Sequence, residues 1–528
     1  MRRSPSFQIS TKNSAKPTTS IDLTNHLSAR GGLFYQDIDT GTTASIKAKN
    51  DPNLLAATYD HSISADTDLN IDLQSLITSE LNSLYPLTLN QETSNKSANT
   101  TKFIDERGGK DKHFFVFTSA GKLVFSQWEN ENHAMGLTGI IHTVMNYFNI
   151  NDNTAMRQFT MYGKDGIMTR FVFLDKNHIK LMVQCNNNYE STAQLQQQLD
   201  LVYSYIISSV SQRNLNKLML KRSNFDLQHY LTDLDQQLLK SLCESLATQP
   251  KLTWFANSLE CLPMSPKKRN AINSILSTTY LDFNISNHNG QILYTLVTSL
   301  DMRLISILRP SNHTLHTMDL QILFEVVRAQ LTDLLLDKVL WFPICFQKFN
   351  DNGFLYALIK VLPNNTIMMV ISSQKNAFDI LNEFVRRIED KMIDDNTCNN
   401  LELQLLDWHK KFPYINHFIY KMKRTVQIYT PSQPTNEMLQ FYYHLKNLCE
   451  DDKGTNLNKS SVAMLKWKND ATPGLLSGVY WATEKFELYI LLNDINLSNQ
   501  SILKSAKLLI QHIREIESYL FISRGVTF

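Results

Sequence analysis

The chain has 528 residues, more than one hydrophobic core can organise, because single cores stop growing at roughly 250 to 300 residues, and we expect about two to four domains. The 52 Lys and Arg residues nearly balance the 50 Asp and Glu residues, so a net charge of +2 excludes the strong positive field of a general nucleic-acid-binding protein. The sequence contains neither an apolar run of roughly 18 residues nor an N-terminal apolar signal core, so we expect no transmembrane helix and no secretory signal.

Residues 1–110 form a polar N-terminal region rich in Ser, Thr, Asn and Asp. Such a segment cannot bury enough apolar surface to offset the entropy lost on ordering, so we predict that it is disordered. Between Leu69 and Leu89, however, leucines recur at near-helical spacing. This stretch indicates either a helix that forms on a partner or a transient helix that has none.

Residues 111–220 are expected to fold as a first α+β unit. His113–Thr118 is aromatic and β-branched, and a turn over Ser119–Lys122 leads into a returning strand, Leu123–Ser126. The remaining predicted elements are a helix over His133–Phe148, strands over Gln158–Tyr162, Met168–Leu174 and Ile179–Gln184, and a long closing helix with an apolar stripe at Leu195, Leu199, Val202, Ile206 and Val210. The order is hairpin, helix, strands and long helix.

The same order of elements recurs twice. A second unit over residues 278–395 begins with a hairpin within Ile292–Leu308, and a third unit over residues 415–528 begins with one within His417–Tyr429. The predicted fold class is therefore α+β, with three antiparallel sheets that are each covered by helices.

The connections between these units are also predicted from the sequence. Residues 221–277 form a helical connector, and residues 396–414 form a linker. In the second unit Thr317 is the predicted N-cap of a helix, with Asp319 in its first turn, where a carboxylate complements the helix dipole.

The motifs that carry catalysis are missing from this sequence, including the P-loop, dinucleotide-binding, nucleophile-elbow, zinc-protease and kinase patterns. Ser119–Lys122 resembles the end of a P-loop, but the first glycine is missing and a strand follows where a helix should. Asp233 and Asp235 stand two residues apart on a predicted helix, so they do not face each other as an acid–base pair.

Metal ligands are not predicted either. His313 and His316 flank a helix start without a third ligand, so we interpret them as turn and cap residues. The six cysteines are scattered, which indicates reduced thiols with neither a disulfide framework nor a zinc site. We expect no catalytic residue, no metal and no cofactor, and we predict that the chain is not an enzyme.

Two short basic clusters are candidate membrane-binding residues. The first cluster is Lys267, Lys268 and Arg269, and the second, in the hairpin turn of the third unit, is Lys421, Lys423 and Arg424. Each cluster is either a solvated set of charges or a contact with an anionic membrane, where one cation contributes about 1 kcal/mol.

Two glycines in one predicted helix mark a candidate binding surface. Gly136 and Gly139 each cost about 1 kcal/mol relative to alanine, so they indicate either tight packing inside the unit or contact with a partner. The candidate partner- or GTPase-binding residues lie on the first hairpin turn and on one face of the following helix: Ser119, Gly121, Lys122, Met135, Gly136, Gly139, Ile140 and Thr143.

Several segments in all three units resemble a known family. They are Lys112–Lys122, Arg309–Leu320, Trp341–Phe346, Phe349–Tyr356, His417–Lys421, Phe486–Tyr489 and Leu520–Ser523. In order and in content they resemble the Mon-one family, whose members consist of three longin domains. The resemblance covers residues 112–528 and implies that each predicted unit is a longin domain.

The resemblance also implies a function. Members of this family pair with a second tri-longin protein, Ccz-one, as a guanine nucleotide exchange factor for a late-endosomal Rab GTPase of the Rab-seven class. It implies that the first unit pairs with the partner's first unit to bind the GTPase, with an upstream early-endosomal Rab and an anionic phosphoinositide membrane as further contacts.

The implied location is cytoplasmic and peripheral on late endosomes, multivesicular bodies, autophagosomes and the vacuole. The implied processes are endosome maturation, vacuole fusion and autophagy. The alternative function is a non-catalytic longin scaffold or adaptor in a vesicle coat or tethering complex. We expect no nucleic-acid partner, because the basic clusters lack interleaved aromatic residues.

Overall fold

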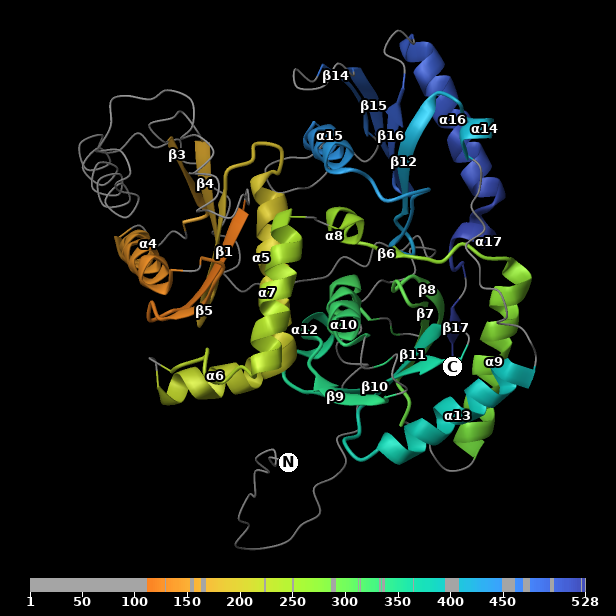
Figure 1. Ribbon diagram of the computed structural model, residues 1–528, viewed down its shortest axis with the longest axis horizontal. Coiled ribbons are helices and arrows are strands. Elements are labelled where there is room, and N and C mark those ends of the chain that lie inside the picture. Colours follow the sequence, from red (N-terminus) through yellow and green to blue (C-terminus); the bar gives the residue numbers. More distant parts are fainter. Residues whose placement is uncertain are drawn as a thin grey trace, which may run out of the picture.

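The computed structural model describes most of residues 112–528 (Figure 1). Within that range it leaves out residues 129, 152–155, 163–167, 223–224, 249–250, 286–290, 312, 314, 332–333, 335–337, 364, 395–407, 449–460, 469–474, 494–497, 524 and 528. The predicted disordered region 1–110, including Leu69–Leu89, lies outside the described residues.

The first unit is a five-stranded antiparallel sheet with strand order β2-β1-β5-β4-β3. Its elements are β1 (Lys112–Thr118), β2 (Leu123–Ser126), α4 (Glu131–Asn151), β3 (Gln158–Tyr162), β4 (Met168–Lys176), β5 (Ile179–Cys185) and α5 (Thr192–Val210). They follow the predicted order, and the predicted stripe from Leu195 to Val210 is buried.

Successive side chains of the central strands point to opposite faces of the first sheet, and both faces are apolar. Phe115 and Phe117 of β1 pack on one face beneath α4, whereas Phe114 and Val116 pack on the other face beneath α5. The chain then continues through α6 (Gln212–Lys221), α7 (Asp233–Thr248), α8 (Leu252–Ala256), the short strand β6 (Leu259–Glu260) and α9 (Pro266–Ile285). Helix α7 packs beside α5 and also contacts β1, so both helices cover the second face of the sheet.

The second unit has a six-stranded sheet with order β17-β8-β7-β11-β10-β9. Its elements are β7 (Tyr294–Ser299), β8 (Leu304–Arg309), α10 (Thr317–Ala329), β9 (Leu340–Ile344), α12 (Gln347–Asn350), β10 (Leu355–Leu362), β11 (Thr366–Ser372) and α13 (Phe378–Asp394). Helix α10 covers one face of this sheet, and α9 and α13 cover the other.

The third unit repeats the plan with sheet order β14-β15-β16-β12-β13-β6. Its elements are α14 (Trp408–Lys411), β12 (Ile415–Met422), β13 (Gln427–Tyr429), α15 (Asn436–Asn447), β14 (Ser461–Lys468), β15 (Leu475–Ala482), β16 (Phe486–Leu492), α16 (Asn499–Glu515), α17 (Glu517–Leu520) and β17 (Val526–Thr527). Helix α15 covers one face, and α14, α16 and α17 cover the other.

Two points of detail differ from the sequence analysis. Strands β6, β14 and β17 and helix α6 were not predicted. The N-cap of α10 is His316, whose Nδ1 accepts the amide of Met318 at 3.2 Å, so the prediction that Thr317 is the cap was wrong by one residue. Thr317 is the first residue of the helix. Asp319 lies in the first turn as predicted, and its carboxylate also accepts the amides of Lys348 and Phe349 at the start of α12.

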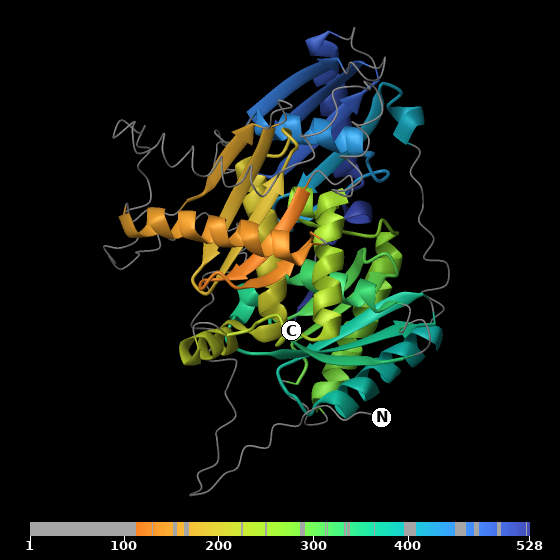
Figure 2. The ribbon, with the colours of Figure 1, turned by 60° about the vertical axis from the view of Figure 1, so that its left-hand side comes forward.

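Two short strands cross between units. Strand β6, from the connector, adds to the third sheet in parallel with β13, and β17, at the C-terminal end of the chain, adds to the second sheet in parallel with β8. The second and third units therefore complete each other's sheets, as the adjoining green and blue ribbons indicate (Figure 2).

The first unit contacts both of the others. Asp200 on α5 binds the ammonium groups of Lys176 in its own unit and Lys348 in the second unit, at 3.0 and 2.8 Å. Toward the third unit, the carbonyl of Tyr189 accepts from the side-chain amide of Asn447 at 2.7 Å. In the residues described, no helix combines the length and apolar character needed to cross a bilayer.

Candidate functional site

The β1–β2 turn is a tight turn that only glycine fits well. The amide of Gly121 donates to the carbonyl of Thr118 at 2.8 Å, and Gly121 has φ +83°, in the left-handed region. A Cβ atom built there would lie 3.0 Å from Nδ1 of His142 on α4. Ser119 and Lys122 flank this glycine, and Lys122 forms an ion pair with Asp226 in the chain between α6 and α7.

Helix α4 has one buried and one exposed face. Leu137, Ile141 and Met145 pack into the core on the inner face. On the outer face Met135 is 49% exposed and Tyr147 is 38% exposed, and Gly139 and Thr143 lie exposed between them. Gly136 and Ile140, the other predicted residues of this face, are half-buried along its margin.

Gly139 decides between the two interpretations of the glycines. A Cβ atom added at Gly139 would meet nothing within 4 Å in the described part of the chain. Tight packing against the described residues of the first unit therefore does not account for Gly139 in the middle of this helix. The helix keeps a residue that costs about 1 kcal/mol relative to alanine, which favours close approach of another molecule at this face.

Strand β3 forms the edge of the first sheet that lies opposite to β2. It pairs with β4 on one side, and among the described residues no strand lies on its other side. Its side chains alternate between half-buried and exposed, and Tyr162 is 72% exposed. We call the β1–β2 turn, the outer face of α4 and the free edge of β3 together the first-unit surface.

The basic cluster at the start of α9 does not form one patch. Lys267 is exposed, but the guanidinium of Arg269 is buried and donates to the carbonyls of Phe521, Ser518 and Leu262 at 2.8, 3.0 and 2.7 Å. Lys268 is half-buried. Arg269 therefore joins the connector to the end of the third unit, and its charge does not face a membrane.

In the second basic cluster, a buried carboxylate balances part of the charge. Glu487 lies 3.7 Å from Nζ of Lys421 and 3.3 Å from Nζ of Lys423. Burial would raise the pKa of Glu487, but the ammonium groups of Lys421, Lys446 and Lys423 hold that pKa below its ordinary value. Arg424 is exposed in the turn.

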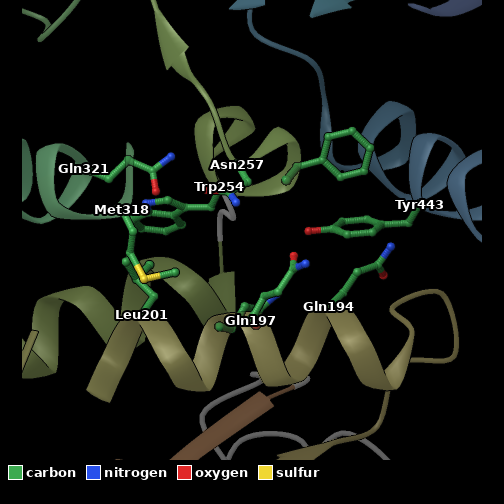
Figure 3. Close-up of a pocket in the computed structure, with 10 residues that line it drawn as sticks. Gln194, Gln197, Leu201, Trp254, Asn257, Met318, Gln321 and Tyr443 are labelled. Atoms are coloured by element: carbon green, nitrogen blue, oxygen red, sulfur yellow. The ribbon is translucent and has the colours of Figure 1, made fainter. Parts of the chain in front are cut away.

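A small cavity of about 40 Å³ lies where the three units meet (Figure 3). Gln194, Gln197 and Leu201 of α5 face Trp254 of α8 and Tyr443 of α15 across it, and Met318 of α10 closes one end. The volume holds only one or a few water molecules, because a water needs roughly 10 to 15 Å³ of such space. It is too small for a nucleotide or a metabolite.

The residues weighed for catalysis serve structural roles. Asp235 accepts the amide and the hydroxyl of Thr232 at the start of α7 and the hydroxyl of Ser209, while Asp233 is exposed. His316 caps α10, as the interpretation of the two histidines expected. Among the residues placed in the structure, no cluster of His, Cys, Asp or Glu could hold a metal ion.

Comparison with known proteins agrees with the three-unit architecture. Residues 112–242, 290–389 and 414–517 match the families described as the first, second and third Longin domain of FUZ, MON1 and HPS1. The chain is 32% identical to "Vacuolar fusion protein MON1" of Eremothecium gossypii, over 97% of this chain and 92% of that protein.

The chain belongs to the Mon1 family of tri-longin proteins. It is also 30% identical to "Vacuolar fusion protein MON1" of Saccharomyces cerevisiae, over 96% of this chain and 87% of that protein. The similarity extends well before residue 112, beyond the segments that carried the resemblance in the sequence analysis. The expected fold of three longin domains is confirmed.

Sequence reasoning identified the turn and the α4 face of the first-unit surface but missed two parts of it. The free edge of β3 becomes visible only from the strand order. His142, which contacts the turn, stands alone in the sequence, and a single histidine on a helix carries no local signal. The helical spacing of His142 from Gly139 and Gly136 does place it near the predicted face.

Proposed function

We propose that the chain is one subunit of a heterodimeric guanine nucleotide exchange factor that activates a Rab GTPase of the Rab-seven class. It would act in vacuole fusion, endosome maturation and autophagy. The observation that carries the proposal is the first-unit surface, where Gly139 is open on an exposed helix face and β3 leaves one edge of the sheet unpaired among the described residues. Membership of the Mon1 family supports it, because the relatives in Eremothecium gossypii and Saccharomyces cerevisiae carry the name vacuolar fusion protein.

Pairing with a second tri-longin protein of the Ccz-one type suits this surface. An open edge strand offers unpaired amide and carbonyl groups, and proteins use such edges to add strands from partners. The exposed side chains of Met135, Tyr147 and Tyr162 supply apolar and aromatic contacts, and the missing side chain of Gly139 lets a partner's backbone approach.

Exchange requires no covalent chemistry. A factor that binds the nucleotide-free GTPase more tightly than the nucleotide-bound form shifts the equilibrium toward nucleotide release by that difference in affinity. Among its described residues, the first-unit surface offers hydrogen-bond donors and a defined shape but no acid–base pair. These features suit a protein that rearranges a switch loop of the GTPase.

The test measures release of a fluorescent GDP analogue from Rab GTPases on addition of the chain co-purified with its partner. Accelerated release with a Rab of this class supports the proposal, and no acceleration with any Rab would refute it. A scaffold or adaptor would bind the GTP-loaded form and leave the release rate unchanged.

A matched pair of glycine variants tests the surface itself. Gly139→Gln adds a side chain to the proposed contact without harming the helix, since glutamine is a good helix former. The control variant is Gly353→Gln. Gly353 lies in a loop of the second unit, where an added Cβ atom would meet only the side chain of Asn350, at 3.7 Å. We expect the first variant alone to weaken pairing or exchange.

Membrane location is also part of the proposal. A peripheral position on late endosomal and vacuolar membranes would draw on anionic phosphoinositides, with an early-endosomal Rab upstream. Exposed Lys267 and the turn bearing Arg424 support it, although Glu487 offsets part of the charge of Lys421 and Lys423.

A further inference from the structure

We infer that His142 is a positioning residue, which fixes the β1–β2 turn on helix α4 so that the turn and the α4 face of the first-unit surface present one shape to the GTPase. The inference rests on the proposed function, since that surface is the one assigned to exchange. It adds a residue that was not among the predicted contacts.

The imidazole of His142 bridges the two elements. Its Nε2 lies 2.7 Å from the carbonyl oxygen of Ser119 in the turn. A carbonyl oxygen only accepts, so Nε2 carries the hydrogen and donates. The ring also meets Phe117 edge-on, with a centroid separation of 6.4 Å. The ring therefore lies between the core strand β1 and the turn that follows it.

Gly121 is the steric complement of this ring. A side chain at Gly121 would bring its Cβ within 3.0 Å of Nδ1 and 3.2 Å of Cγ of His142, closer than ordinary contacts. The glycine thus serves two needs, the left-handed backbone of the turn and space for the imidazole.

A polar chain behind the ring fixes its position. The side-chain amide nitrogen of Asn146, one turn further along α4, lies 3.2 Å from Nε2 and 3.4 Å from Nδ1 of His142, and with the hydrogen on Nε2 it can donate only to Nδ1. The amide oxygen of Asn146 accepts from Nζ of Lys180 at 2.8 Å, and Lys180 lies 3.9 Å from Asp175. The chain of contacts therefore runs from the turn through α4 to β5 and β4.

These contacts are not needed to close the hairpin. Strands β1 and β2 are already held in register by their own ladder, and the turn is closed by backbone bonds between Thr118 and Lys122 and between Gly121 and Thr118. The hydrogen bond from His142 to Ser119 in addition fixes the position of the turn relative to α4. Such a restraint matters to a binding surface more than to the fold of the hairpin.

Positioning affects exchange through the cost of ordering. A turn that moved independently of α4 would have to be ordered when the nucleotide-free GTPase binds, and that cost reduces the preference for the empty state. We expect a loss of about tenfold in kcat/KM, carried mainly by kcat, because substrate capture also uses the rest of the surface.

The experiment compares His142→Ala, His142→Gln and His133→Ala in the complex with the partner. His133 is an exposed residue in the first turn of the same helix and is the matched control. We expect roughly tenfold lower kcat/KM for His142→Ala and recovery of most of the loss for His142→Gln, whose amide can still donate to Ser119. Partner pairing should be retained in all three variants.

A double-mutant cycle gives a second, independent measurement. Gly121→Ala should impair exchange partly by displacing the imidazole, and that part should vanish in the Gly121→Ala/His142→Ala double variant. Additive losses at the two positions, or an active His142→Ala complex equal to wild type, overturn the inference. A wild-type complex that releases no nucleotide from any Rab refutes the proposed function instead.

Discussion

Arg269 offers the sharpest test of how the second and third units are joined. Its buried guanidinium donates to the carbonyls of Phe521, Ser518 and Leu262, the first two at the end of the third unit. Arg269→Met keeps the length of the side chain but leaves these carbonyls without their donor. An unsatisfied buried polar group costs about 1 to 3 kcal/mol.

Two effects make the expected loss of stability smaller than three times the cost of one unsatisfied carbonyl. Burial lowers the pKa of Arg269, which indicates that the native charge is itself partly desolvated, and this penalty is relieved in the variant. Water can also reach a helix end that has loosened. We therefore expect a net loss of about 4 kcal/mol in the free energy of unfolding.

The assay is thermal unfolding of the full chain, followed by fluorescence and by limited proteolysis. For a folded body of roughly 400 residues, a loss of about 4 kcal/mol lowers Tm by roughly 5 °C. The control is Lys267→Met, an exposed cation on the same helix, for which we expect almost no change. Equal Tm values for the two variants would show that Arg269 does not join the units.

Three further predictions concern other sites. Gly139→Ala should raise the free energy of unfolding of the chain alone by about 0.5 to 1 kcal/mol, measured in urea, because the added methyl group meets nothing in the described structure. Glu190→Gln should cost about 3 kcal/mol in the same assay, because it leaves the ammonium of Lys112, now 2.9 Å from Glu190, buried without its counter-ion. Burial raises the pKa of Asp319 to about 7, so its protonated form stabilises the fold; this contribution is complete below the unfolded pKa of 3.8 and is lost as pH rises through about 7. The stability of wild type relative to Asp319→Asn, followed by Tm, should accordingly fall between about pH 4 and pH 7.

Each of these predictions has a contrary outcome. A destabilised Gly139→Ala chain would mean that α4 packs against something within the chain. Equal stability of Glu190→Gln and the exposed control Glu131→Gln would show that the ammonium group of Lys112 does not need the carboxylate of Glu190 as its counter-ion. A pH-independent difference for Asp319→Asn would show that this carboxylate stays charged throughout the range.

The sequence predicted regular elements well where local pattern determines them. The β strands of each hairpin and the long amphipathic α5 follow from alternation and from apolar spacing, and both depend on the near neighbours of each residue. Strands β6 and β17 are two residues long and exist only because a sheet from another unit offers its edge. No local pattern can predict such a strand.

The basic cluster on α9 shows what a closer reading of helical spacing could have found. Arg269 falls on the same helix face as Ile272 and Leu276, three and seven residues further on, and both are fully buried. Lys267 points elsewhere and stays in solvent. Composition marks all three basic residues alike, whereas the periodicity of the helix separates the buried cation from its exposed neighbour.

For the predicted binding surface, the turn and the exposed face of α4 were accessible to sequence reasoning because two glycines in a helix are unusual. The choice between internal packing and partner contact was not accessible, since it depends on the empty space around Gly139. The bond from His142 to Ser119 joins residues that are 23 positions apart, and only tertiary structure brings them together.

The two crossing strands also constrain the order in which a newly made chain can fold. A ribosome releases Leu259–Glu260 long before Gln427–Tyr429, the strand beside which β6 must lie. The second sheet must likewise wait for Val526–Thr527, which are made after the other elements of the third unit. The second sheet therefore cannot be complete before the third unit has been synthesised, and until then the nascent chain exposes the unpaired edge of β8 to chaperones.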